Sequence, residues 1–161
     1  MTKVLIAVGL IFGSNLSFAQ QGTLGSPAPR PKQYVTYAAE EQIVKAGKKS
    51  VVELHFKVGD GFHVNSHTPK SELLIPTAIT LKPADGVTAS PAEYPVGTAY
   101  SFSFEPGEKL DVYTGSFTVK VPVIAEAGPH TIDGVLRYQA CDNAACYPPK
   151  SLPVQVPVTA K

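Results

Sequence analysis

The 161-residue chain lacks the features that mark several common classes of protein. Positive and negative side chains are nearly equal in number, with 14 Lys and Arg and 13 Asp and Glu. This balance argues against nucleic acid and anionic lipid as partners. No P-loop, nucleophile elbow or catalytic carboxylate pair occurs, so nucleotide binding and hydrolysis have no support. Beyond the N-terminus no segment is apolar enough to cross a membrane. We therefore expect one domain that uses no cofactor and no small-molecule substrate.

The N-terminus has the three parts of a secretory signal peptide. Lys3 gives a cationic start, residues 4–13 are apolar, and Ser17 and Ala19 are the small residues that a signal peptidase reads. Residues 1–19 are therefore predicted to be a signal peptide cleaved near Ala19; the alternative is a buried hydrophobic element. Residues 20–33 carry three prolines and no apolar periodicity, which predicts a flexible tether.

Residues 34–161 are predicted to form one all-β domain. Apolar and polar residues alternate over 52–58, 117–123 and 152–158, the period of a half-buried strand. Weaker strand candidates are 34–38, 78–82, 87–90 and 131–139, and only 38–46 suggests a helix. Many short strands separated by Gly and Pro turns favour an antiparallel sandwich or barrel. Pro153 and Pro157 predict that the last strand lies at an edge or contains breaks, because proline donates no ladder hydrogen bond.

The chain's two cysteines, Cys141 and Cys146, follow a strand candidate and are expected at a hairpin tip. Asp142 and Asn143 between them favour the turn that a disulfide needs, with Cα atoms roughly 4.4–6.8 Å apart. So short a loop stabilises a fold by about 2 kcal/mol, against about 4.7 kcal/mol for a long one. Spacing alone leaves a structural bridge and a redox pair equally open. The charge of Asp142 would raise the pKa of a neighbouring thiol.

The residues around the cysteines resemble a known family. Tyr138-Gln139-Ala140-Cys141 followed by Cys146-Tyr147-Pro148-Pro149 is similar to the cysteine loop of the N-terminal periplasmic domain of the thiol:disulfide interchange protein DsbD. The segment 61–66, GFHVNS, and shorter pieces near residues 74, 112 and 119 occur in the family's order, so the resemblance spans about residues 34–158. His63 and Asn65 stand where family members carry aromatic residues.

The resemblance implies an immunoglobulin-like β-sandwich with a redox role in the periplasm. Cys141 and Cys146 would be the catalytic pair of a protein-disulfide reductase, with Cys141 the more buried. Electrons would come from a separate membrane donor of the DsbD/CcdA type. They would pass to thioredoxin-like proteins, including disulfide isomerases and reductases of cytochrome c maturation. The alternative is a non-catalytic exported binding or adaptor module in which the C-x4-C disulfide is structural.

The predicted surroundings of the pair are aromatic and polar. They comprise Tyr138, Gln139, Asp142, Asn143, Tyr147, His63 and Asn65. By resemblance, residues 101–106 would form a cap loop in which Phe102 or Phe104 shields the sulfurs. His63 and His67 could instead join a cysteine in a metal site, but their segment has loop character and we predict no metal.

Overall fold

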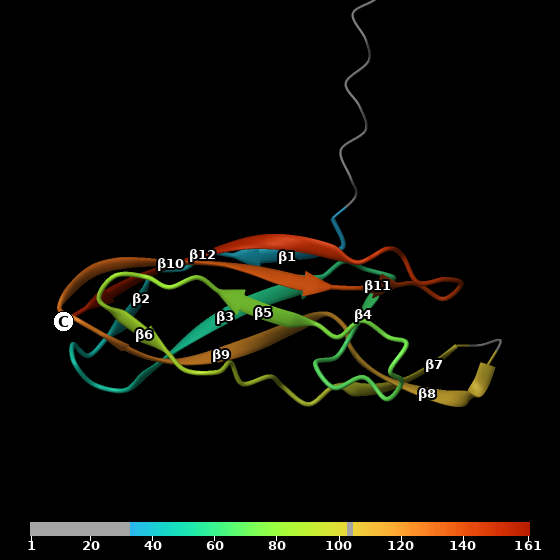
Figure 1. The fold of residues 1–161 in the computed structure, drawn as a ribbon. Coiled ribbons are helices and arrows are strands. Elements are labelled where there is room, and N and C mark those ends of the chain that lie inside the picture. The colour runs from blue at the N-terminus through green and yellow to red at the C-terminus, as the bar shows by residue number, and fades with distance from the viewer. Residues whose placement is uncertain (1–32, 103–104) are drawn as a thin grey trace, which may run out of the picture. The chain divides into compact units, whose positions relative to one another are not determined.

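The computed structural model describes residues 33–102 and 105–161, which form an all-β domain (Figure 1). The predicted signal peptide, nearly all of the predicted tether, and Phe104 lie outside these residues. In the described part of the chain there is no helix, and hence none that could span a membrane.

Twelve strands form three four-stranded sheets. The first sheet has the order β1 (Val35–Ala38), β3 (Ser50–Val58), β9 (Ser116–Ala125) and β6 (Val87–Ala89). The second has β2 (Gln42–Val44), β12 (Lys150–Ala160), β10 (Gly128–Tyr138) and β5 (Ala78–Leu81). The third has β11 (Ala140–Cys141), β4 (His63–Asn65), β8 (Glu105–Tyr113) and β7 (Thr98–Phe102). The neighbouring strands are antiparallel except β2 and β12, which are parallel.

The core lies between the first and second sheets. On β3 the alternate residues Val52, Leu54 and Phe56 are buried, and on β12 Val154 and Val156 are buried in the same cluster. Each fully buried side chain of this kind contributes about 1.5–3 kcal/mol to folding. The predicted class, an immunoglobulin-like β-sandwich, is confirmed.

The helix suggested for residues 38–46 is wrong. Residues 42–44 form β2, which pairs in parallel with Val158–Ala160 at the end of β12. Good helix formers such as Ala39, Glu40 and Glu41 suggested the helix, but helix propensity is weak and pairing with a long strand overrides it. Gly47, with φ of +63°, makes the turn into β3.

The prediction that the last strand lies at an edge or contains breaks is also wrong, because β12 lies between β2 and β10 and is continuous. Its prolines are nevertheless tolerated, since β2 pairs only with residues 158–160. The carbonyl of Gln155, which shares the parity of Pro153 and Pro157, accepts a hydrogen bond from the Tyr37 hydroxyl on β1. The backbone N–H and C=O positions of residues 153, 155 and 157 thus point away from β10. Proline at 153 and 157 therefore removes no hydrogen bond between β12 and β10.

The third sheet positions the cysteines. Strand β11 continues the path of β10, and β4 pairs on one side with β11 and on the other with β8. Of the predicted cap loop, residues 101–102 are the end of β7 and residues 105–106 are the start of β8, and Phe102 pairs with Glu105. The outer strands of this sheet are β11, which leads into the cysteine segment, and β7, which belongs to the β7–β8 hairpin, called the aromatic hairpin below (Figure 1).

Candidate functional site: a disulfide hairpin

Cys141 and Cys146 form a disulfide across a small hairpin that begins at β11. Two backbone hydrogen bonds flank the pair, Asp142 N to Ala145 O at 2.9 Å and Tyr147 N to Ala140 O at 2.8 Å. The cysteines therefore face each other at a non-hydrogen-bonded position, where antiparallel strands approach most closely. This explains why their Cα atoms lie only 3.9 Å apart, below the predicted range.

The two sulfurs differ in their environments. Cys141 is fully buried, and Cys146 is exposed on the outer arm of the hairpin. The predicted order of burial is confirmed. Thiol–disulfide exchange requires access of an incoming thiolate to the attacked sulfur. Of the two cysteines, Cys146 is the one that is exposed to solvent and so open to an incoming thiolate.

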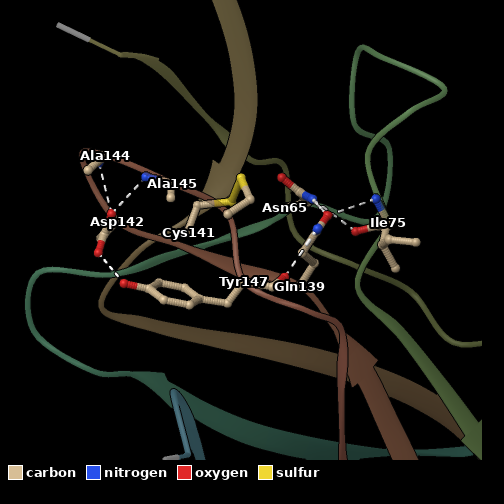
Figure 2. The surroundings of a disulfide bond; sticks show 9 residues. Asn65, Ile75, Gln139, Cys141, Asp142, Ala144, Ala145 and Tyr147 are labelled. Carbon is tan, nitrogen blue, oxygen red and sulfur yellow. Dashed lines mark hydrogen bonds between the residues drawn. A yellow bond between two sulfur atoms is a disulfide. The ribbon is translucent and has the colours of Figure 1, made fainter.

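Asp142 holds the turn of the hairpin through its carboxylate. One oxygen, Oδ1, accepts hydrogen bonds from the amides of Ala144 and Ala145 at 2.8 and 2.9 Å, and Oδ2 accepts one from the Tyr147 hydroxyl (Figure 2). These bonds, above all that from Tyr147, lower the pKa of Asp142 below its usual value. The same bond to Asp142 raises the pKa of Tyr147. The turn is thus held by an ionised carboxylate independently of the disulfide.

Gln139 connects the hairpin to the rest of the third sheet. Its Oε1 accepts hydrogen bonds from Asn65 Nδ2 at 3.1 Å and from the Ile75 amide at 3.2 Å. Its Nε2 donates to the Tyr147 carbonyl at 3.2 Å (Figure 2). Asn65 Nδ2 also donates to the Ile75 carbonyl at 3.0 Å. Asn65 and Gln139, both predicted near the cysteines, therefore act together as one polar junction behind them.

Aromatic rings support the outer arm of the hairpin. The Tyr147 ring stacks on Tyr34, with ring centroids 5.0 Å apart, and Phe62 lies against both rings. Lys150 Nζ lies 5.2 Å from the centroid of the Tyr34 ring. Tyr138 is placed differently from its neighbours in sequence, because its side chain lies fully buried in the sandwich core. Its hydroxyl accepts a hydrogen bond from the Tyr34 amide and donates one to Gln33 Oε1.

The aromatic hairpin covers the other side of the site. Tyr100 on β7 lies against the ring of His63, with centroids 4.0 Å apart, and Phe102 lies 5.9 Å from His63. The Tyr100 hydroxyl donates a 2.6 Å hydrogen bond to Asn143 Oδ1 in the cysteine hairpin. Tyr100 was not among the site residues predicted from the sequence. It could have been predicted from its position two residues before Phe102, because alternate residues of a strand lie on the same face.

The two histidines named for a metal site have separate environments. His63 is buried beside Tyr100, whereas the His67 ring stacks on Tyr94 with centroids 3.7 Å apart and its Nδ1 lies 3.0 Å from the Thr77 carbonyl. Across residues 33–102 and 105–161 no three His, Cys, Asp or Glu side chains gather as metal ligands. We therefore assign no metal to these residues.

Fold and site together define a β-sandwich that presents a disulfide hairpin with one buried and one exposed cysteine. Such a domain has the form expected of a thiol–disulfide exchange module. The chain belongs to the family of the N-terminal domain of the thiol:disulfide interchange protein DsbD, whose family model matches residues 22–156. A role in thiol–disulfide interchange follows from this membership. No curated protein matches the chain.

Several solved structures are similar to the chain. One is the reduced DsbD N-terminal domain of Neisseria meningitidis, with 22% identity and a TM-score of 0.45 over 69% of this chain and 79% of that chain. Another is the complex between the DsbD and PilB N-terminal domains of the same organism, at 21% identity and a TM-score of 0.43 over 68% and 77% of the two chains. A third is the N-terminal periplasmic domain of ScsB from Proteus mirabilis, at 11% identity and a TM-score of 0.47, covering 76% of this chain and 44% of that one.

Proposed function

We propose that this protein carries reducing equivalents in the periplasm through Cys141 and Cys146 and delivers them to thioredoxin-like proteins, as a protein-disulfide reductase. The observation that carries the proposal is the disulfide between an exposed cysteine and a buried one on a hairpin. A structural bridge has no need for an accessible sulfur, whereas exchange does. Family membership supports the same chemistry.

The reaction proceeds in two steps. In the reduced protein the Cys146 thiolate attacks a disulfide of the partner, forming a mixed disulfide and releasing one partner thiolate. Cys141 then attacks the sulfur of Cys146, forms the intramolecular disulfide and releases the second partner thiolate. Two electrons pass to the partner, and the two protons of the dithiol go with them. Tyr100 and Phe102 would cover the pair between encounters, as the cap.

The proposal extends to the rest of the chain. Residues 1–19 act as a signal peptide that exports the protein, and residues 20–33 tether the domain formed by 34–161. A separate membrane protein of the DsbD/CcdA type re-reduces the pair after each transfer. Cleavage near Ala19 is tested by mass spectrometry of the exported protein.

Trapping of mixed disulfides tests the function. The Cys141→Ser variant retains the exposed sulfur and loses the resolving one, so it should form a stable covalent adduct with a thioredoxin-like protein. The matched Cys146→Ser variant, which leaves only the buried sulfur, should form at least tenfold less adduct under the same conditions.

A redox titration distinguishes an electron carrier from a protein with a structural disulfide. The carrier should equilibrate with glutathione and thioredoxin buffers at a potential above about −300 mV. A potential well below that value, together with no adduct from either serine variant, would assign the disulfide to structure. The protein would then be a binding or adaptor module.

A further inference from the structure

His63 is a buried imidazole directly opposite the buried cysteine. In the pairing of β4 with β11, His63 and Cys141 are in register, and residues so paired project to the same face with Cβ atoms about 4.5–5.5 Å apart. Both side chains are almost completely excluded from solvent, with exposures of 2% and 0%. Their mutual position is fixed by backbone pairing and not by flexible loops.

One ring nitrogen of His63 lacks a partner. Nε2 is buried and makes no hydrogen bond to any of the residues that the structure describes. A buried polar atom without a partner costs free energy, on the order of 1–3 kcal/mol, and calls for an explanation. The disulfide beside it carries no proton. Reduction creates a thiol on Cys141. This thiol, in register with His63, is a hydrogen-bond donor that the disulfide lacks.

We propose that His63 is the base that accepts the proton of the Cys141 thiol when Cys141 resolves the mixed disulfide. The inference rests on the proposed function, since it requires the pair to cycle between dithiol and disulfide. Cys141 has no contact with water to take its proton. The adjacent imidazole takes it as the sulfur attacks Cys146, and passes it to solvent or to the departing partner thiolate. When the pair is reduced again, the proton returns to Cys141.

The surroundings of His63 suit a proton acceptor. Burial lowers its pKa, and the charge of Asp142 opposes that shift without cancelling it, so the ring is neutral at neutral pH. The titratable groups that face it are Cys141 from β11, Asp142 from the hairpin and Tyr100 from β7. Tyr113 of β8 is in register with the neighbouring position of β4 and lies on the other face.

The test uses the reduced full chain and the aromatic disulfide DTNB, which needs no protein partner. Cys146 attacks the reagent and releases one thionitrobenzoate, and resolution by Cys141 releases a second, so stopped-flow absorbance separates the two steps. In the wild type the second phase should reach a plateau with rising pH once His63 is neutral. In His63→Gln, whose amide accepts a hydrogen bond but no proton, that phase should slow roughly tenfold or more and lose its plateau. The first phase should be unchanged.

His55→Gln is the matched control, because His55 lies on β3 with its Nδ1 3.0 Å from the Thr118 hydroxyl. It should behave as the wild type in both phases. A second phase of His63→Gln with the wild-type rate and pH profile overturns the inference. If that variant does not fold, the wild-type profile decides, since a rise of about tenfold per pH unit without a plateau excludes a base. Normal DTNB phases without exchange toward thioredoxin-like proteins would refute the proposed function and leave this inference standing.

Discussion

Reduction of the disulfide should cost this fold little stability, and the cost can be worked from the hairpin. The bridge closes a loop of six residues, for which the loss of chain entropy in the unfolded state amounts to about 2 kcal/mol. By linkage, the pair in the folded protein should have a potential roughly 45 mV below that of the same cysteines in the unfolded chain. An electron carrier needs the folded protein to lose little stability on reduction, because each turnover passes through the dithiol form.

The hairpin should keep its shape when reduced, since most of its bonds do not involve sulfur. The flanking backbone bonds at Asp142 and Tyr147 remain, as do the contacts of the Asp142 carboxylate and the link from Gln139. The sandwich core is built from other residues and does not depend on the bridge. Reduction therefore removes a constraint on the unfolded chain more than a support of the folded one.

Urea unfolding with and without dithiothreitol measures the cost. The chain contains no tryptophan, so circular dichroism is the suitable signal. We expect the free energy of unfolding to fall by about 2 kcal/mol on reduction. The Cys146→Ser variant should match the reduced protein and show no response to the reductant. A fall of more than about 4 kcal/mol, or loss of the native spectrum, would refute the reasoning and favour a structural bridge.

Three further predictions concern the residues that hold the hairpin. Tyr100→Phe removes the bond to Asn143, worth about 0.5–1.5 kcal/mol, and should speed reduction of the disulfide by glutathione about two- to tenfold; an unchanged rate would show that this contact does not restrain the hairpin. Gln139→Met should lower the free energy of urea unfolding by about 2 kcal/mol, and a loss under about 0.5 kcal/mol would contradict its role as junction. The pKa of Asp142 is lower in the folded protein than in the unfolded chain. Its ionised carboxylate therefore contributes fully to the free energy of unfolding above the pKa of an unfolded Asp, and this contribution disappears as pH falls through the pKa of the folded protein. The stabilities of wild type and Asp142→Asn should differ at neutral pH and converge in acid; a constant difference would be evidence against the ionised turn.

The sequence predicted those parts of the fold whose pattern is local. Apolar residues recur at alternate positions in β3, β9 and β12, because one face of each lies on the core, and all three strands were predicted. Strand β2 was taken for helix, since its state depends on distant residues of β12. Strands β7 and β8 were not among the predicted strands, and residues 101–106 were expected to form a cap loop, because the turn formers Pro106 and Gly107 do not show where pairing resumes.

The site was predictable to the extent that it is contiguous in sequence. The cysteine hairpin holds its own turn residues, so Asp142 and Asn143 could be named from their spacing. Tyr100 could not, because its contact with Asn143 spans 43 residues and depends on the register of β7 and β8. Tyr138 was assigned to the surroundings of the cysteines from its proximity in sequence, but the alternation of β10 directs its ring into the core.

The accessibility of Cys146 follows from its place at the end of a sheet. The third sheet terminates in β11, and residues 145–147 form the outer arm beyond it, joined by the bonds that flank the cysteine pair. At a non-hydrogen-bonded position the N–H and C=O of Cys146 point away from the strand of Cys141. Open edges normally invite strand addition, but Pro148 and Pro149 follow at once and cannot donate to a ladder. A partner at this edge therefore meets one outward-facing backbone position and one exposed, disulfide-bonded cysteine on the same residue, which suits a brief covalent encounter better than a lasting β-sheet interface.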